Sequence, residues 1–258
     1  MDLLKNNKRR SAVSTTLYVG LNVGLAIAVL LVVQLVGTLW PAVLLVLLSK
    51  WRILAVRPRY WAVNLQANLV DIIVSVGVVI LLLGATGHGV LQFGLTLLYI
   101  GWLLFLKPRS SHTAISLQAA AAVFVGVTAL FMVSYGWPAS AVVLAMWGIG
   151  YAATRHVLSA YHESHILFLS LVFGFLFAEI GWLTYHWAFA YGVTEFGTIK
   201  VPQAAVIALG VSFVAERAYV SHHKHGQIQL NDVLLPILLT SSVIIILFAL
   251  FNEASVSI

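Results

Sequence analysis

The chain has 258 residues, of which 61% are hydrophobic and only 9% charged, and its mean hydropathy is +1.00. A soluble domain carries about 25% charged residues, so this composition excludes a water-soluble globular protein and indicates an integral membrane protein. The sequence contains no cysteine, which excludes disulfides and thiolate metal sites. Its formal charge of +6 lies mostly in short segments between apolar runs, which favours anionic lipid headgroups over nucleic acid as the counter-charge.

The apolar runs predict the elements in chain order. The first run, 13–36, exceeds the roughly 7–15 apolar residues of a signal peptide, so we expect a retained membrane span. Eight further runs follow between polar breaks. We predict an all-α integral membrane protein, one polytopic domain over 1–258, with nine transmembrane helices at 13–36, 38–55, 62–84, 89–106, 114–135, 138–159, 166–191, 201–220 and 232–251.

The distribution of basic residues predicts how these helices are oriented. With nine spans and a cytoplasmic N-terminus, Lys200 is the only one of the 14 basic residues that falls outside. Basic residues concentrate in cytoplasmic loops of membrane proteins. We therefore expect a multi-pass protein of the cell membrane with its N-terminus in the cytoplasm and its C-terminus outside.

Internal similarity indicates a repeated unit after the first helix. The segment GIGYAATRHVLS (148–159) aligns without gaps on GVSFVAERAYVS (210–221). Together with recurring basic turns, this similarity predicts an N-terminal helix, 1–36, followed by four tandem hairpins at 37–87, 88–136, 137–192 and 198–251. True duplication and mere similarity of apolar helices in composition both remain open.

Polar residues interrupt two of the predicted spans. In NLQANLVDIIVS (64–75), residues Asn64, Asn68, Asp71 and Ser75 are spaced so that they share one helix face. We expect Asp71 near the middle of its span, without a basic partner at the same depth. Glu179 and His186 share a face of the seventh span. These residues are expected either in a polar packing seam or along a transport or ligand pathway.

Histidines and arginines gather at the predicted cytoplasmic ends. Their spacing does not match the histidine boxes of membrane di-iron enzymes, so metal ligation is only an alternative to binding headgroups and water. Arg155 and Arg217 each lie near the end of an inward-running helix, where a cation complements the helix dipole or binds a lipid phosphate. The candidate interfacial residues are Arg155, His156, His162, His165, Glu216, Arg217, His222, His223 and His225. No metal and no cofactor are predicted.

Glycines occur at spacings that favour close helix packing. Gly20 and Gly24 form a small-xxx-small pattern, and Gly148, Gly150, Gly174 and Gly181 lie within later spans. We expect these glycines to allow neighbouring helices of the chain to approach closely.

The last third of the chain resembles an uncharacterised family of multi-pass membrane proteins from reduced-genome bacteria of the candidate phyla radiation. The resemblance rests on EIGWLTYHW (179–187) and on the basic turn HKHGQIQL before the last span. It implies a bacterial cytoplasmic membrane and brings no assigned activity.

Three functional classes follow, in order of preference. The first is a non-catalytic scaffold or subunit of a membrane complex, with a basic cytoplasmic side that faces lipid or a membrane-protein partner. The second is a small transporter or channel that uses Asp71 and Glu179. The third is a lipid-modifying enzyme with a histidine-rich site at the cytoplasmic face.

Overall fold

The computed structural model describes residues 2–186, 190–192 and 200–251. Within these ranges the chain is helical except for a short antiparallel ribbon of β1 (Ala190–Gly192) and β2 (Lys200–Pro202). The α-helices are α1 (Asp2–Val36), α2 (Leu39–Ser49), α3 (Trp61–Ala67), α4 (Leu69–Gly84), α5 (Gly89–Gly101), α6 (His112–Val133), α7 (Ala139–Ala160), α8 (Ile166–His186), α9 (Gln203–His225) and α10 (Leu230–Phe251). Two short 3-10 helices, η1 (Trp51–Ile53) and η2 (Pro58–Tyr60), lie between α2 and α3, and a π-helical turn, η3 (Trp102–Leu106), extends α5.

The helices are long and apolar enough to be membrane spans, as the sequence predicts. Within the described residues, seven straight segments meet this criterion by length and composition, and the bent pair of α3 and α4 brings the number to eight. The predicted second span, 38–55, contains only the 11-residue α2. At about 1.5 Å per residue, such a helix is shorter than the roughly 30 Å hydrocarbon core. The count of nine spans is therefore not confirmed.

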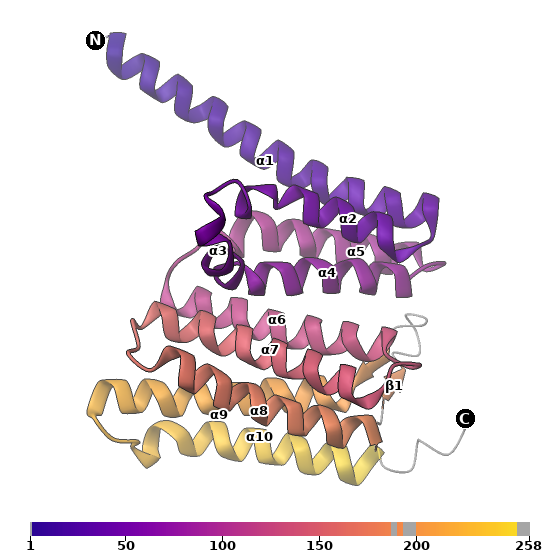
Figure 1. Cartoon of the computed structure of the whole chain (residues 1–258), viewed down its shortest axis with the longest axis vertical. Helices are drawn as coiled ribbons and strands as arrows, with labels where there is room; N and C mark the ends of the chain where they lie inside the picture. Colours follow the sequence, from indigo (N-terminus) through magenta and orange to yellow (C-terminus); the bar gives the residue numbers. More distant parts are fainter. Residues whose placement is uncertain (1, 187–189, 193–199, 252–258) are drawn as a thin grey trace.

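The long helices run back and forth along the bundle, and α6 packs against α4 rather than against α5, which precedes it in the chain (Figure 1). Because of this back-and-forth course, the connections that follow α2, η3, α7 and α9 lie at one end of the bundle, on the left of the view. We call this end the basic end, because basic side chains gather in its connections. They are Lys50, Arg52, Arg57, Arg59, Lys107 and Arg109, with Lys224 in the last turn of α9.

Two apolar cores hold the bundle together. The first lies among α1, α2, α4 and α5 and includes the fully buried Val29, Val46 and Val79. The second lies among α6, α7, α8 and α9 and includes the fully buried Met146 and Phe177. Many other large apolar side chains remain exposed, which is typical of helices whose outer faces contact lipid.

The two cores meet where α4 crosses α6. A Cβ atom on Gly77 would lie 2.6 Å from Val125 Cγ1, and one on Gly126 would lie 2.6 Å from Ile73 Cγ2. Glycine at both positions therefore lets the two backbones approach closely.

The predicted role of the other glycines is confirmed in part. Gly150, Gly174 and Gly181 lie at the close contact between α7 and α8, where an added Cβ would come within 3 Å of a neighbouring side chain. Gly20, Gly24 and Gly148 have no such neighbour within 4 Å, so the expectation of close packing is wrong for these three.

Candidate functional site

The third predicted span is broken at Asn68. The helix α3 ends at Ala67, α4 begins at Leu69, and the two axes differ by 64°. The Asn68 side-chain amide donates to the Asn64 carbonyl at 2.8 Å, and that of Asn64 donates to the Ile53 carbonyl at 3.4 Å. The prediction that Asn64, Asn68, Asp71 and Ser75 share one helix face is therefore wrong, because Asn64 belongs to a separate helix.

The break also determines where Asp71 lies. This residue is in the first turn of α4, close to the basic end of the bundle, rather than at the middle of a straight helix. Ser75 lies one turn further into α4, where it is buried and donates to the Asp71 carbonyl at 2.6 Å.

Asp71 is paired with two lysines. Lys50, which follows α2, donates to Asp71 Oδ2, and Lys107, which follows η3, lies 2.9 Å from the same oxygen. The indole of Trp102 donates to Asp71 Oδ1 at 3.3 Å. The expectation that Asp71 lacks a basic partner is wrong, because lysine side chains at the ends of neighbouring helices reach back along the bundle.

This ion cluster, Lys50, Asp71 and Lys107, carries a net positive charge. The side chains of Lys50 and Asp71 are only 7% and 12% exposed, whereas Lys107 is 36% exposed. With both lysines protonated, one carboxylate neutralises only one of the two ammonium groups, so the cluster retains a charge available to an anion.

An open pocket of about 1280 Å³ adjoins the ion cluster. We call it the α1 pocket, because apolar residues of α1 form one of its walls. The rest of the lining includes the three cluster residues together with Arg52 and Asn68. The apolar wall is made by Leu17, Tyr18, Gly20, Leu21, Gly24, Leu25 and Ala28.

The second predicted intramembrane acid does not join this site. Glu179 lies on α8 in the other half of the bundle, is exposed, and makes no hydrogen bond or ion pair with any described residue. His186 is also exposed, and its ring contacts that of Trp182 with centroids 4.8 Å apart.

Arg155 and Arg217 have the same local environment at aligned positions. Arg155 lies over the ring of Tyr151, with Cζ 5.9 Å from the centroid, and Arg217 lies over Phe213 at 5.4 Å. Each ring is four residues earlier on the same helix, α7 or α9. The two segments thus share a contact as well as a sequence pattern, although duplication itself stays a prediction.

The predicted interfacial histidines do not converge on one centre. His156 is half-buried and bonds Gln118 Oε1 at 2.7 Å. His223 packs with Tyr161 and Tyr219, while His112 stacks on Tyr161 at 4.5 Å. In the described part of the chain, no three His, Asp or Glu side chains are placed to hold a metal ion.

The remaining interfacial histidines lie at the exposed surface. His162 has a positive φ of 54° in the turn after α7, and His165 and His222 are exposed. His225 lies 3.6 Å from Asp232. In the same region, hydrogen bonds from the Tyr219 hydroxyl and the His165 backbone N–H lower the pKa of Glu163 to about 2.

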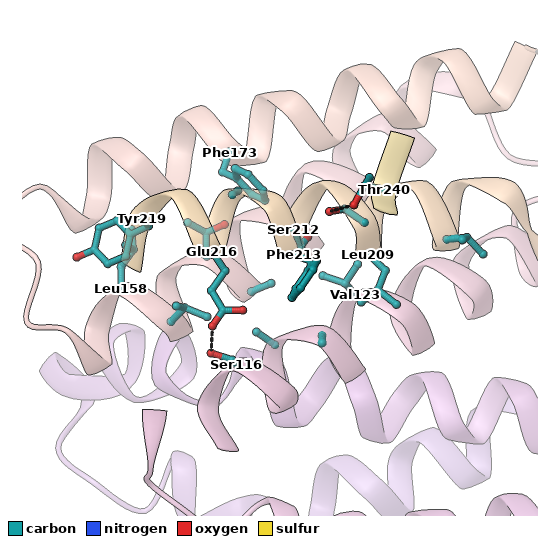
Figure 2. Close-up of a pocket in the computed structure, with 18 of the residues that line it drawn as sticks. Ser116, Val123, Leu158, Phe173, Leu209, Ser212, Phe213, Glu216, Tyr219 and Thr240 are labelled. Carbon is teal, nitrogen blue, oxygen red and sulfur yellow. Dashed lines mark hydrogen bonds between the residues drawn. The ribbon is translucent and has the colours of Figure 1, made fainter. Parts of the chain in front are cut away.

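Glu216 lies apart from the histidines, inside a mostly apolar cavity of about 580 Å³ between α6, α7, α8, α9 and α10. Its carboxylate accepts a hydrogen bond from Ser116 of α6 (Figure 2). We call this space the Glu216 cavity.

Sequence reasoning missed Lys50, Lys107, Trp102 and Ser116. Lys50 lies in the predicted span 38–55 and Lys107 directly follows the predicted span 89–106. Both spans end on the side where the predicted span 62–84 begins, and the long reach of lysine is a signal for pairing with Asp71. No comparable signal identifies Trp102 or Ser116, because their contacts join residues 31 and 100 positions apart.

Comparison with protein-family models, with curated proteins and with solved structures finds no match to this chain. The resemblance carried by residues 179–187 therefore stays a prediction, and the geometry of the sites is the basis for inferring function.

Proposed function

We propose that the protein is a non-catalytic scaffold or subunit of a membrane complex whose basic end faces the cytoplasm and holds an anionic lipid headgroup in the α1 pocket. In this proposal α2 completes nine passes, which leave the N-terminus inside and the C-terminus outside. The positive-inside distribution of the basic residues supports this orientation.

The ion cluster is the observation that carries the proposal. Lys107 is partly exposed and lines the α1 pocket together with Lys50 and Arg52. A lipid phosphate entering the pocket would pair with the surplus ammonium and with the guanidinium through charge-assisted hydrogen bonds. Asp71 would remain bound to Lys50, which keeps the lysine ordered for this contact.

The wall formed by α1 suits the acyl part of the same lipid. Gly20 and Gly24 leave open space beside α1, and Leu17, Leu21 and Leu25 provide an apolar surface along it. The pocket thus combines cationic and apolar walls, as the headgroup and chains of an anionic phospholipid require.

Glu179 supports the assignment as a subunit. An ionised carboxylate inside a membrane costs at least about 2.5–3.5 kcal/mol on insertion scales, and this one is exposed without a partner among the described residues. A donor on the transmembrane helix of a partner protein would offset that cost.

The bend between α3 and α4 favours a second candidate, a small transporter. Discontinuous helices form the substrate sites of many transporters, and here the break lies beside Asp71 at the α1 pocket. In this alternative the anion at the cluster is a transported solute. Anion uptake into proteoliposomes that is lost in Lys107→Gln would favour transport over a scaffold.

The proposal is tested by lipid binding to the purified protein. We expect phosphatidylglycerol to bind more tightly than phosphatidylcholine with the same chains, measured by native mass spectrometry. Lys107→Gln should weaken phosphatidylglycerol binding about tenfold, since a hydrogen bond to a charged group contributes about 1.5–3 kcal/mol and 1.4 kcal/mol is tenfold. Lys224→Gln removes one positive charge from the same end outside the pocket and should leave binding unchanged.

Two results would contradict the proposal. One is equal affinity of the wild-type protein for the two lipids. The other is an equal loss of phosphatidylglycerol binding in Lys107→Gln and Lys224→Gln. The loss would then come from the net positive charge of the basic end and not from the α1 pocket.

A further inference from the structure

The Glu216 cavity is a second pocket, remote from the ion cluster. Figure 2 shows its length along α9, with Tyr219 and Thr240 towards opposite ends and Glu216 between them. Its volume of about 580 Å³ falls within the roughly 300–1,000 Å³ of small-molecule sites. Val172 of α8 and Leu239 of α10 line it and are 50% and 55% exposed, so the cavity is open to the lipid-facing surface.

The walls of the cavity are suited to an aliphatic chain. Apolar side chains such as Val123, Phe173 and Leu209 make most of the lining, so water inside would have few of the polar partners it needs. An acyl chain that leaves the bilayer to fill such a space gains little free energy, because the lipid tails around it are as apolar as the cavity walls. Any selectivity of the cavity must therefore come from its polar residues.

Six polar residues line the cavity, namely Ser116, Thr154, Ser212, Glu216, Tyr219 and Thr240, and Glu216 is the only charged one among the described lining residues. An ionised carboxylate has about four acceptor sites, and Ser116 donates to Oε1. Oε2 has no hydrogen-bond partner among the described residues. The lining supplies no cation, so the ligand must bring the donor that a carboxylate in apolar surroundings requires.

A cation on the protein contacts one of the lining residues. The guanidinium of the exposed Arg217 lies over the ring of Phe213, which is part of the lining, with Cζ 5.4 Å from the centroid. An acid in the lining and an arginine beside a lining residue are complementary to a headgroup that carries an ammonium and a phosphate.

We propose that the Glu216 cavity binds a phospholipid whose headgroup ends in a primary amine, with the ammonium donating to Glu216, the phosphate near Arg217 and one acyl chain between α8 and α10. A primary ammonium has N–H groups for a charge-assisted bond to the carboxylate. A quaternary ammonium of the same charge has none, and an anionic headgroup would meet the carboxylate with like charge.

The experiment compares three lipids with identical acyl chains on the full-length protein. Purified protein is equilibrated with equal amounts of phosphatidylethanolamine, phosphatidylcholine and phosphatidylglycerol, and the retained lipids are quantified by mass spectrometry. The wild-type protein should retain phosphatidylethanolamine over phosphatidylcholine about tenfold. Both lipids are zwitterionic, so they differ in the N–H groups of the ammonium and not in net charge. The ratio of the two retained lipids therefore measures the effect of these N–H groups in the wild-type protein itself.

Variants then locate the preference. Glu216→Gln should abolish it, whereas Lys224→Gln, a glutamine substitution at the basic end outside the cavity, should preserve it. Ala120→Phe should fill the cavity and lower retained phosphatidylethanolamine without affecting phosphatidylglycerol at the α1 pocket. Lys107→Gln should lower retained phosphatidylglycerol without affecting phosphatidylethanolamine. The two proposed lipid sites are therefore tested separately.

The inference is overturned if the wild-type protein does not distinguish phosphatidylethanolamine from phosphatidylcholine. It is also overturned if the preference survives in a folded Glu216→Gln protein, or if Ala120→Phe leaves retained phosphatidylethanolamine unchanged.

Discussion

Asp71 and Glu179 are both acids within predicted membrane spans, but their surroundings differ. The Asp71 side chain is 12% exposed and bonded to Lys50, Lys107 and Trp102. Glu179 is exposed and has no partner among the described residues. The buried carboxylate of Asp71 compensates the charge of the buried Lys50, so Asp71 stabilises this half of the bundle whether or not the pocket holds an anion.

Asp71→Asn should therefore destabilise the protein. The variant leaves Lys50 buried and without a counter-ion, and removing one partner of a buried pair costs about 3–5 kcal/mol. With a shift of roughly 2–4 °C per kcal/mol for a chain of this size, we expect a clear fall in Tm, measured by thermal unfolding in detergent. Glu179→Gln is the matched control and should leave the Tm of the isolated protein unchanged. Equal Tm values for wild type and Asp71→Asn would show that the ion cluster contributes nothing to stability.

The contrast between these acids shows what the sequence could predict at this scale. An acid within an apolar run can be recognised from the sequence, and the sequence identifies both Asp71 and Glu179 in this way. It does not identify the partners of Asp71, because they lie 21 and 36 positions away in sequence and their contact depends on the bend at Asn68. Local periodicity assumes a straight helix, and Asn68 is neither proline nor glycine, the usual signals of a break.

At the scale of elements, apolar runs located the helices of the second half closely. The predicted spans 114–135 and 138–159 correspond to α6 (His112–Val133) and α7 (Ala139–Ala160). The last span corresponds to α10 in the same way. These helices are unbroken, and each ends where the apolar run gives way to a polar turn. The short α2 and the bent α3 and α4 depart from prediction because packing among helices, rather than composition, determines where they end.

The crossing of α4 and α6 gives a prediction at this scale. Gly77→Ala places a Cβ 2.6 Å from Val125 Cγ1 and 3.2 Å from the Val125 carbonyl oxygen. The backbone atom cannot rotate away, so the helices must separate, and overpacking of this kind costs about 1–3 kcal/mol. We expect a lower Tm and weaker contact between the two halves, measured by thermal unfolding and limited proteolysis.

Gly94→Ala is the control for this substitution. Gly94 lies in α5 with no atom within 4 Å of an added Cβ. Alanine there should be neutral or stabilising by up to about 1 kcal/mol through helix propensity. A Gly77→Ala protein as stable as Gly94→Ala would contradict a close crossing of α4 and α6.

At the scale of the whole molecule, the short α2 decides how the rest of the bundle is oriented. If α2 crosses the membrane, the connections at the basic end all face the cytoplasm. If α2 turns back within the membrane, the segments before and after it lie on the same side. The residues from η1 to η2 would then carry Arg52, Arg57 and Arg59 to the outer face, against the positive-inside rule.

Single cysteines in this cysteine-free chain distinguish these arrangements. In intact cells, a membrane-impermeant thiol reagent should label Thr38→Cys and Thr86→Cys, at the end opposite the basic end. It should leave Arg57→Cys and Ser110→Cys unlabelled until the membrane is permeabilised. Labelling of Thr38→Cys and Arg57→Cys from the same side would contradict nine passes and make α2 a re-entrant segment. In the expected pattern, the 11 residues of α2 cross a locally thinned bilayer, which accommodates a short span at a modest cost per ångström of mismatch. An anionic headgroup bound to Lys50 and Lys107 beside the end of α2 would favour that thinning by drawing the lipid phosphate towards the bundle.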